Sequence, residues 1–323
     1  MKIIIPAAGV GTRLRPHTLT KPKPLLPVAG HRMIDLIMAE IIALPHVDEI
    51  IFIIGYRGDM IREYITKSYP DVPCSFVEQK EYKGLGHAVS LVEEHVHPDD
   101  DILIILSDTI FKADLASVIA KKQNALGVCH VDDPRRFGVA VMQGDRVTGL
   151  IEKPETPVSN LALVGIYYIA NGPHLFDQLD HLIKNDITTK NEIQLTDALS
   201  RMLDAGEPFT VFPVTQWFDC GTKDATLDTN RTLIKHRVGK ATVTDSVIIP
   251  PVVIDDDAII ERSVVGPYVY ICSGAEVRSS VVSNSIIGEA VVEHAVLDGA
   301  FLDDNSVFRG RPKAPDLGMS ASV

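Results

Sequence analysis

The first part of the chain combines a glycine turn with spaced cations. An apolar run leads into Ile5-Pro6-Ala7-Ala8-Gly9-Val10-Gly11, and the positions that follow carry Arg13, Arg15, Lys21 and Lys23. Glycines let backbone N–H groups approach phosphate oxygens closely, and the cations supply the opposing charge. All charged residues before Asp35 are basic, in a chain whose formal net charge is −12. This pattern predicts a local site for a polyphosphate, with a surface turn bearing solvated cations as the alternative.

The glycine turn differs from two common phosphate-binding motifs. A P-loop needs Gly-x-x-x-x-Gly-Lys-[Ser/Thr], which is absent here, and the dinucleotide fingerprint needs a third glycine where Leu14 stands. The turn therefore predicts neither a P-loop nucleotidase nor a nicotinamide enzyme.

Two carboxylates follow apolar segments and are candidates for holding a divalent cation. Asp108 follows residues 102–106 and Ser107, and Asp219 lies in Trp217-Phe218-Asp219-Cys220-Gly221-Thr222 after the apolar segment 209–214. Mg²⁺ is a hard ion that proteins hold with one or two carboxylates and the phosphates of a substrate. Taken alone, Asp108 is equally compatible with a turn or a helix N-cap.

The elements that must position these residues alternate between strands and helices. Residues 3–5, 50–54 and 102–106 are short apolar runs typical of buried parallel strands, and residues 33–44, 58–68 and 85–94 have helical periodicity. We expect a doubly wound, Rossmann-like α/β sheet that is mixed but mainly parallel. Ligands of such sheets bind beyond the carboxyl ends of the strands, where both the glycine turn and Asp108 would lie.

The glycine turn also carries a resemblance to a known family. The residues Gly9, Gly11, Thr12, Arg13, Leu14 and Pro16, followed by Lys23 and Leu25-Leu26-Pro27-Val28, resemble the signature of the sugar-nucleotide pyrophosphorylases. These nucleotidyltransferases act on a nucleoside triphosphate and a sugar 1-phosphate. The resemblance implies catalytic roles for Arg13 and Lys23, and nucleotide binding by Ala8, Gly9, Gly11, Thr12, Arg13 and Lys23.

A second segment, Gln79-Lys80-Glu81-Tyr82-Lys83-Gly84-Leu85, is informative about the base. A glutamine amide can both donate to and accept from a base edge, and a glycine lets the chain pass close to a flat ring. The pattern is similar to the pyrimidine-reading loop of thymidylyl- and uridylyltransferases. Through this resemblance, Gln79 and Gly84 become nucleotide-binding candidates, and UTP or dTTP the expected donor.

Further motifs resemble the sugar side and the metal site of the same family. Arg136-Phe137-Gly138-Val139, Ile151-Glu152-Lys153-Pro154 and the strand containing Gly165 resemble its sugar-phosphate elements, and residues 192–197 resemble the uridylyltransferase form. The resemblance implies that Gly138, Glu152, Lys153 and Gly165 bind the sugar phosphate, that Lys153 is catalytic, and that Asp108 and Asp219 hold Mg²⁺. The chain departs from the family at Ser107-Asp108-Thr109, where Gly-Asp-Asn is frequent.

The last part of the chain contains a repeat. Apolar residues recur every 15 to 17 positions in three series: Ile254, Ile271, Ile287 and Leu302; Ile260, Val277, Val292 and Phe308; Val265, Val282 and Leu297. Three inward-facing series per turn predict a left-handed parallel β-helix of the hexapeptide kind, with an antiparallel sandwich as the alternative. We expect a catalytic domain at 1–238 and a β-helix domain with a short tail at 239–323.

Composition limits the cellular setting and the partners. Four scattered cysteines give no metal or disulfide framework, which favours a reducing cytoplasm, and the apolar runs are too short for a membrane span. The apolar start is broken by Pro6, so we expect no signal peptide.

From Ala241 onward, 12 acidic against 5 basic side chains give a net charge of −7, which argues against nucleic acid as a partner of this region. The open solenoid end favours a homo-oligomer.

Together these observations predict Mg²⁺-dependent nucleotidyl transfer from UTP or dTTP to a hexose 1-phosphate, with glucose 1-phosphate as the expected acceptor. Alternatives stay open. A mannose-1-phosphate guanylyltransferase shares the opening motif and also carries a β-helix, and a non-catalytic nucleotide-sugar sensor would use the same pocket. A hexapeptide acyltransferase would require a histidine within the repeats, where His294 is the sole candidate.

Overall fold

The computed structural model describes residues 1–311, which form two compact units. By their contacts, Met1–Leu26 and Met33–Gly221 form the first unit, and Pro27–Arg32 joins the residues from Thr222 onward in the second. The predicted tail lies outside the described residues from position 312 on. The boundary predicted after residue 238 stays a prediction about folding domains, because contacts alone divide the described chain after Gly221.

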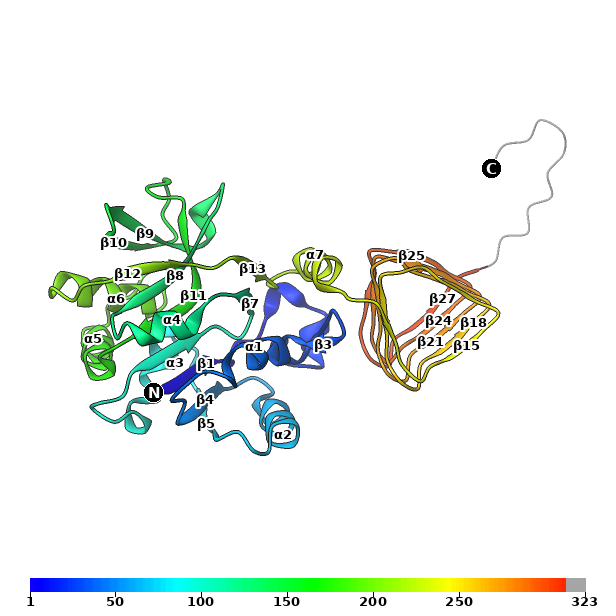
Figure 1. Cartoon of the computed structure of the whole chain (residues 1–323), viewed down its shortest axis with the longest axis horizontal. Helices are drawn as coiled ribbons and strands as arrows, with labels where there is room; N and C mark the ends of the chain where they lie inside the picture. The colour runs from blue at the N-terminus through cyan, green and yellow to red at the C-terminus, as the bar shows by residue number, and fades with distance from the viewer. Residues whose placement is uncertain (312–323) are drawn as a thin grey trace. The chain divides into compact units, whose positions relative to one another are not determined.

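The first unit is built on a mixed sheet (Figure 1). Within residues 1–311, nine strands join it; the main path runs β10-β9-β11-β6-β1-β4-β5, and β8 pairs with both β11 and β12. The strands β6, β1, β4 and β5 are parallel, whereas β11 is antiparallel to β6, β8 and β9. This confirms the predicted mixed, doubly wound sheet. The strands are β1 Lys2–Pro6, β4 Glu49–Ile54, β5 Cys74–Glu78, β6 Ile102–Ile105, β8 Ala125–His130, β9 Gly138–Gln143, β10 Arg146–Glu152, β11 Leu161–Ile169 and β12 Thr210–Pro213.

Alternation along β1 divides the core into two layers. Ile3 and Ile5 pack with the apolar residues of α1, α2 and α4, whereas Ile4 packs with those of α3, α5 and α6. Successive side chains of a strand point to opposite faces, so a run of isoleucines buries both faces of the sheet. The helices of this unit are α1 Met33–Ile41, α2 Gly58–Ser68, α3 Leu85–Ser90, α4 Leu115–Ala120, α5 Gly172–Lys184 and α6 Leu195–Asp204.

The helices are shorter than their periodicity predicted in two places. The helix expected at 33–44 ends at Ile41, because Pro45 has no N–H with which to continue the hydrogen-bond ladder. The helix expected at 85–94 ends at Ser90, where Leu91 N donates to Ala88 O (3.2 Å) in a tighter turn. In the part of the chain that the structure describes, no helix is both long and apolar enough to span a membrane.

Short elements carry the segments around the expected site. The glycine turn leads into the 3₁₀ helices η1 Thr12–Leu14, η2 His17–Leu19 and η3 Lys23–Leu25, and the hairpin of β2 Pro27–Val28 and β3 His31–Arg32 follows. The strand β7 Thr109–Lys112 pairs antiparallel with β13 Gln216–Asp219. This pairing joins two segments that are far apart in the sequence.

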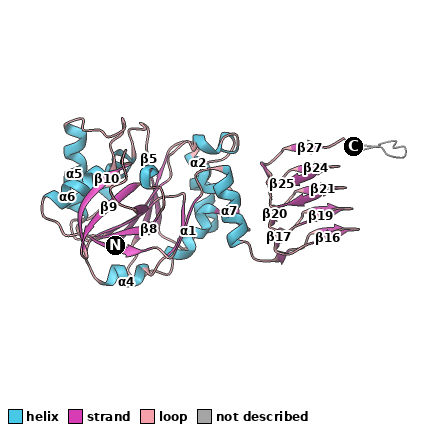
Figure 2. Cartoon of the chain, turned by 90° about the horizontal axis from the view of Figure 1, so that it is seen from above, coloured by secondary structure: helices cyan, strands magenta, loops and turns pink. Residues whose placement is uncertain are grey.

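The second unit contains α7, Lys223–Leu233, and a left-handed parallel β-helix. In the described coils, short strands stack in three parallel sheets, β14-β17-β20-β23-β26, β15-β18-β21-β24-β27 and β16-β19-β22-β25, and Figure 2 shows the coils one above another. This confirms the β-helix that the 15-to-17-residue repeat predicted. The strands are β14 Arg237–Val238, β15 Thr242–Thr244, β16 Val247–Ile248, β17 Val252–Ile254, β18 Ile259–Glu261, β19 Val264–Val265, β20 Val269–Ile271, β21 Glu276–Arg278, β22 Val281–Ser283, β23 Ile286–Ile287, β24 Val291–Glu293, β25 Val296–Asp298, β26 Phe301–Leu302 and β27 Val307–Arg309.

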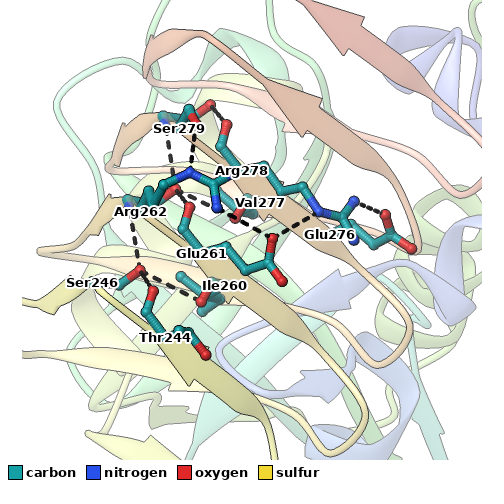
Figure 3. Close-up of polar contacts among 11 residues, drawn as sticks. Thr244, Ser246, Ile260, Glu261, Arg262, Glu276, Val277, Arg278 and Ser279 are labelled. Atoms are coloured by element: carbon teal, nitrogen blue, oxygen red, sulfur yellow. Dashed lines mark hydrogen bonds and ion pairs between the residues drawn. The ribbon is translucent and has the colours of Figure 1, made fainter.

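Polar groups hold successive coils in register (Figure 3). Glu261 and Arg278 face each other on neighbouring strands, with Arg278 Nε 3.2 Å from Glu261 Oε2. At one corner, the Ser246 hydroxyl accepts a hydrogen bond from Ser263 N (3.0 Å), and the Ser263 hydroxyl accepts one from Ser280 N (3.1 Å). A solvent-accessible ion pair contributes about 0–1 kcal/mol, so this pair adds a small preference for the observed register.

The structure shows where two residues singled out in the predicted β-helix lie. Phe308, expected to point inward, has 43% of its surface exposed, because no further described coil stacks upon it. His294 is exposed at a corner with φ +51°, in the same left-handed conformation as Arg262 and Ser279 of the preceding coils. Its position therefore follows from the turn geometry, and the acyltransferase alternative gains no support from it.

Candidate functional site

A cavity of about 440 Å³ lies at the carboxyl ends of the parallel strands in the first unit. The glycine turn after β1, the segment after β5 and the segment after β6 all contribute to its wall, as expected for this kind of sheet. The nine predicted residues among those that line it are Ala8, Gly9, Gly11, Thr12, Arg13, Lys23, Gln79, Gly84 and Asp108. The structure thus brings together the whole predicted nucleotide-binding set and one of the two predicted metal ligands.

The glycine turn is shaped by its two glycines in different ways. Gly11 has φ +67°, and its carbonyl accepts hydrogen bonds from Leu14 N (3.0 Å) and from the Thr18 hydroxyl (2.8 Å). Gly9 lines the cavity, and a Cβ placed on it would meet no protein atom within 4 Å. Glycine at position 9 therefore leaves open space where a ligand can approach the backbone, whereas glycine at position 11 permits the turn itself.

Lys23 and Asp108 form an ion pair in the cavity wall. Lys23 Nζ lies 2.5 Å from Asp108 Oδ2, and the side chains are 11% and 31% exposed. The cation reaches this position from η3, and the carboxylate follows β6, so residues far apart in the sequence meet at one point. A partly buried pair loses less of its attraction to solvent than a surface pair does.

Asp219 lies beside this pair through backbone pairing. β13 and β7 align Asp219 with Thr109, the residue after Asp108, and Cys220 N donates to Asp108 O (3.4 Å). A Cβ on Gly221 would lie 2.8 Å from Asp219 Oδ1 and 3.0 Å from the Arg13 guanidinium. Asp219, at the end of β13, and Asp108, one residue before β7, therefore lie at the same paired end of these two strands, with Arg13 close to Asp219.

The donor set of these strands fits a magnesium ion that the substrate helps to hold. Within residues 1–311, no cluster of three or more His, Cys, Asp or Glu side chains is arranged to bind a metal. Mg²⁺ does not require such a cluster, because it retains waters and binds one or two carboxylates together with phosphate oxygens. Asp108, which lines the cavity, and Asp219, whose neighbour Gly221 lines it, supply two carboxylates beside the cavity.

The Gln79 side chain is held in place by its neighbours. It is 5% exposed, and its Nε2 lies 3.4 Å from Gly84 O and 3.3 Å from His87 Nδ1. Burial lowers the pKa of His87, and the nearby charge of Lys83 lowers it further. A neutral imidazole can accept a hydrogen bond from the amide, which fixes which way Gln79 presents its donor and acceptor.

Gly84 fits against the backbone of residues 192–194. Its φ is +110°, and a Cβ there would lie 2.6 Å from Ile193 O. Two backbone hydrogen bonds hold the two segments together, from Ile193 N to Lys83 O (2.8 Å) and from Gly86 N to Ile193 O (2.8 Å). A side chain at position 84 must therefore displace the loop that carries Gln79.

Replacing Gly84 by alanine is expected to raise the KM for the nucleotide about tenfold, because a loop moved away from Ile193 no longer presents Gln79 correctly. Steady-state kinetics with varied nucleotide measure this. Gly144→Ala is the matched control: Gly144 also has positive φ (+58°), but a Cβ there meets nothing within 4 Å. Equal KM values for the two variants would contradict the role given to the Gly84 contact.

The predicted sugar-phosphate residues form a second group. Glu152 accepts a hydrogen bond from the Thr196 hydroxyl (2.7 Å) and lies 3.1 Å from Lys153 Nζ, and a Cβ on Gly138 would be 3.0 Å from Glu152 Oε2. Lys153 has φ +43°, and its backbone N donates to Phe137 O (3.1 Å). Gly138, Glu152 and Lys153 are thus close together, although they are not among the described residues that line the 440 Å³ cavity.

Gly165 has a packing role that the sequence did not reveal. It has φ +83° where the pairing of β11 shifts register, and a Cβ there would lie 2.6 Å from the side chain of Leu106. Gly165 O accepts a hydrogen bond from Leu106 N (2.9 Å). Gly165 therefore packs against Leu106, which lines the cavity. The contact between Gly165 and the sugar stays a prediction.

Several cavity residues were not predicted as site residues. Tyr82 lies between Gln79 and Gly84 in the same loop, and Glu192 begins the segment that packs on Gly84. Tyr82 lies in the predicted base-reading segment, and Glu192 begins the segment 192–197 that resembles the uridylyltransferase form. Their position inside these motifs was the only sequence feature that could have indicated that they line the cavity. Asp197 is not among the described residues that line the cavity; burial raises its pKa, a hydrogen bond with Thr189 opposes this shift, and the charge of Glu152 adds to it.

Known proteins are similar to this chain over most of its length. The family model described as nucleotidyl transferase matches residues 2–236. The chain is 31% identical over 264 residues to the bifunctional protein GlmU of Methanococcus vannielii, covering 77% of this chain and 61% of that protein, so it spans less than two thirds of this relative. It is 31% identical over 225 residues to the UTP–glucose-1-phosphate uridylyltransferase AglF of Haloferax volcanii, covering 67% and 89%.

A solved structure extends the likeness to three dimensions. A UDP-glucose pyrophosphorylase in complex with UDP-glucose aligns with a TM-score of 0.61 and 25% identity, covering 72% of this chain and 97% of that one. The glycine turn, Lys23, Asp108 and the loop after β5 all lie within the residues that the family model matches. The chain belongs to the nucleotidyl transferase family.

Proposed function

We propose that this chain transfers a uridylyl or thymidylyl group from UTP or dTTP to glucose 1-phosphate and releases pyrophosphate. The observation that carries the proposal is the single cavity that gathers the glycine turn, Arg13, the Lys23–Asp108 pair and the Gln79–Gly84 loop. A triphosphate requires open backbone and positive charge, which the glycine turn, Arg13 and the Lys23–Asp108 pair provide. The edge of a pyrimidine base can hydrogen-bond with the amide in the Gln79–Gly84 loop. Similarity to a uridylyltransferase and to a UDP-glucose pyrophosphorylase supports the choice of base and sugar.

In the proposed reaction, an oxygen of the sugar phosphate attacks the α-phosphorus of the nucleotide in line. A bond forms between these atoms, and the bond from the α-phosphorus to its bridging oxygen breaks, with the electron pair leaving on pyrophosphate. Positioning and charge stabilisation supply most of the catalysis in such transfers, so no covalent enzyme intermediate is required.

Each group of site residues would have its own role in this reaction. Arg13 and Lys23 would bind the triphosphate and stabilise the charge that develops on the leaving pyrophosphate. Lys153 would hold the attacking phosphate, with Glu152 beside it to orient the ammonium group. Asp108 and Asp219 would hold Mg²⁺, which when bound neutralises phosphate charge.

The Lys23–Asp108 pair suggests how binding proceeds. Without substrate, each side chain neutralises the other across 2.5 Å. An incoming phosphate oxygen would compete with Asp108 for Lys23, and the carboxylate would then be available to the metal. Triphosphate and Mg²⁺ would therefore bind cooperatively, since each removes one partner of the pair.

The test is pyrophosphate release in Mg²⁺ across UTP, dTTP, GTP, CTP and ATP against glucose, galactose, mannose and N-acetylglucosamine 1-phosphates. We expect turnover with UTP or dTTP and glucose 1-phosphate, with the nucleotide sugar identified by mass spectrometry. Turnover confined to GTP and mannose 1-phosphate would replace the proposal by the guanylyl alternative. No turnover by folded protein that still binds a nucleotide sugar would favour the sensor.

A further inference from the structure

The hairpin β2–β3 connects the segment that carries Lys23 to the second unit. Its residues, Pro27–Arg32, belong by their contacts to that unit, although the residues on either side belong to the first. Only Pro24, Leu25 and Leu26 separate Lys23 from the hairpin, and all three are buried. Leu26 N donates to Lys23 O (3.1 Å), and Met33 N donates to Leu26 O (3.1 Å). Lys23 is therefore joined to the hairpin by a short, buried and hydrogen-bonded segment.

Asp219 has a similarly short connection to the same unit. Cys220 and Gly221 are followed by Thr222, which caps α7 by accepting a hydrogen bond from Ala225 N at its side-chain oxygen (3.3 Å). The helix α7 lies entirely in the second unit. The predicted catalytic lysine and one predicted metal ligand therefore each continue, within a few residues, into elements of that unit.

Asn230 of α7 joins these two connections. Its Oδ1 accepts a hydrogen bond from Ala29 N in the hairpin (2.9 Å), and its Nδ2 donates to Tyr268 O of the β-helix (3.2 Å). The side chain is 1% exposed. A buried amide with both ends engaged cannot be removed without leaving a donor or acceptor unpaired, at a cost larger than that of losing an exposed hydrogen bond.

The tip of the hairpin is also fitted closely to the second unit. Ala29 and Gly30 have φ values of +51° and +88°, and a Cβ on Gly30 would lie 3.0 Å from Val253 Cγ1 in the β-helix. Left-handed backbone at two successive positions makes the turn that brings Ala29 N toward Asn230. The hairpin is thus held by a hydrogen bond on one side and by close packing on another.

We propose that Asn230 is a positioning residue for nucleotidyl transfer, which fixes the hairpin and through it the placement of Lys23 against Asp108. The β-helix then takes part in setting the catalytic geometry, through Tyr268 and Val253, in addition to any role in assembly. This rests on the proposed function of the cavity. Displacing a catalytic group by about 1 Å can cost about 10²-fold in rate, so a small shift of the hairpin has a measurable effect.

The direct test is Asn230→Leu, which is close in size and removes both hydrogen bonds. We expect kcat to fall about tenfold or more, while the KM values for nucleotide and sugar phosphate change less than threefold. Arg231→Ala is the matched control. Arg231 ties the same helix to the β-helix, through Asn284 Oδ1 (3.0 Å) and over the Tyr268 ring, but is not bonded to the hairpin. Its activity is expected to stay at the wild-type value.

A double-mutant cycle separates positioning from a general folding defect. If Asn230 acts through Lys23, Asn230→Leu should lower kcat little further in a Lys23→Ala background, whereas a structural defect would multiply the two losses. Equal folded fractions are checked by thermal unfolding of each full-length variant. Should Asn230→Leu fail to fold, Gly30→Ala takes its place in the cycle, because its Cβ would press the hairpin tip away from Val253.

The outcomes distinguish this proposal from the proposed function. A folded Asn230→Leu variant with wild-type kcat, or losses that multiply in the cycle, would overturn the positioning role while leaving the transferase assignment intact. A wild-type chain with no transfer activity toward any nucleotide and sugar phosphate would overturn the proposed function first. A loss in Arg231→Ala equal to that in Asn230→Leu would place the effect in α7 as a whole, against a specific role for Asn230.

Discussion

Replacing Lys23 by alanine is expected to lower kcat by about 10² or more, with a smaller rise in the KM for the nucleotide. Lys23 Nζ lies 2.5 Å from Asp108 in the cavity wall, and in the proposed reaction this ammonium group would stabilise the charge that develops on the leaving pyrophosphate. Losing one preorganised group that stabilises a transition state costs about 10²–10³ in kcat. Initial rates of pyrophosphate release at saturating sugar 1-phosphate measure the effect.

Lys112→Ala is the matched control for this prediction. Lys112 also pairs with a carboxylate, that of Glu40, but it lies on the exposed end of β7 and does not line the cavity. Exposed pairs contribute about 0–1 kcal/mol, so this variant should keep its activity and nearly all of its stability. Near-full activity of Lys23→Ala would refute the catalytic role of Lys23, whatever the control shows.

The parallel half of the first unit and the β-helix could be predicted from the sequence, because their signals are local. The runs at residues 3–5, 50–54 and 102–106 are apolar at every position, as strands buried on both faces must be. The β-helix could be predicted because its apolar residues recur at a fixed spacing, which is visible in the sequence alone. The cavity could also be anticipated, since a known rule places ligands at the carboxyl ends of parallel strands.

The rest depends on contacts between distant segments, which local patterns do not encode. Nothing near Asp219 in the sequence indicates that β13 pairs with β7, yet this pairing brings Asp219 beside Asp108. The residues Pro27–Arg32 fall within an unbroken motif, and the structure nevertheless assigns them to the second unit. Gly165 matched a family motif, but its packing against Leu106 was visible only once β11 and β6 were paired.

The second large effect is expected from the two aspartates. Asp108→Asn and Asp219→Asn keep the side-chain size and remove the negative charge, and each should lower kcat about 10²-fold and raise the Mg²⁺ concentration needed for half-maximal rate. The reason is that an amide oxygen is a weaker ligand than a carboxylate for a hard cation. Titrating Mg²⁺ at fixed nucleotide gives both quantities, and chelation should abolish wild-type turnover.

The double variant tests whether the two carboxylates serve one ion. If both bind the same Mg²⁺, the first substitution already removes most of what that ion contributes, so the loss in Asp108→Asn/Asp219→Asn should be well below the product of the single losses. Binding of Mn²⁺ in the presence of nucleotide, followed by its paramagnetic signal, should weaken in each single variant. Asp145→Asn, in the exposed turn between β9 and β10, should leave both measurements unchanged. Losses that multiply, with Mn²⁺ binding intact, would mean that the aspartates act separately and that Asp108 serves mainly to place Lys23.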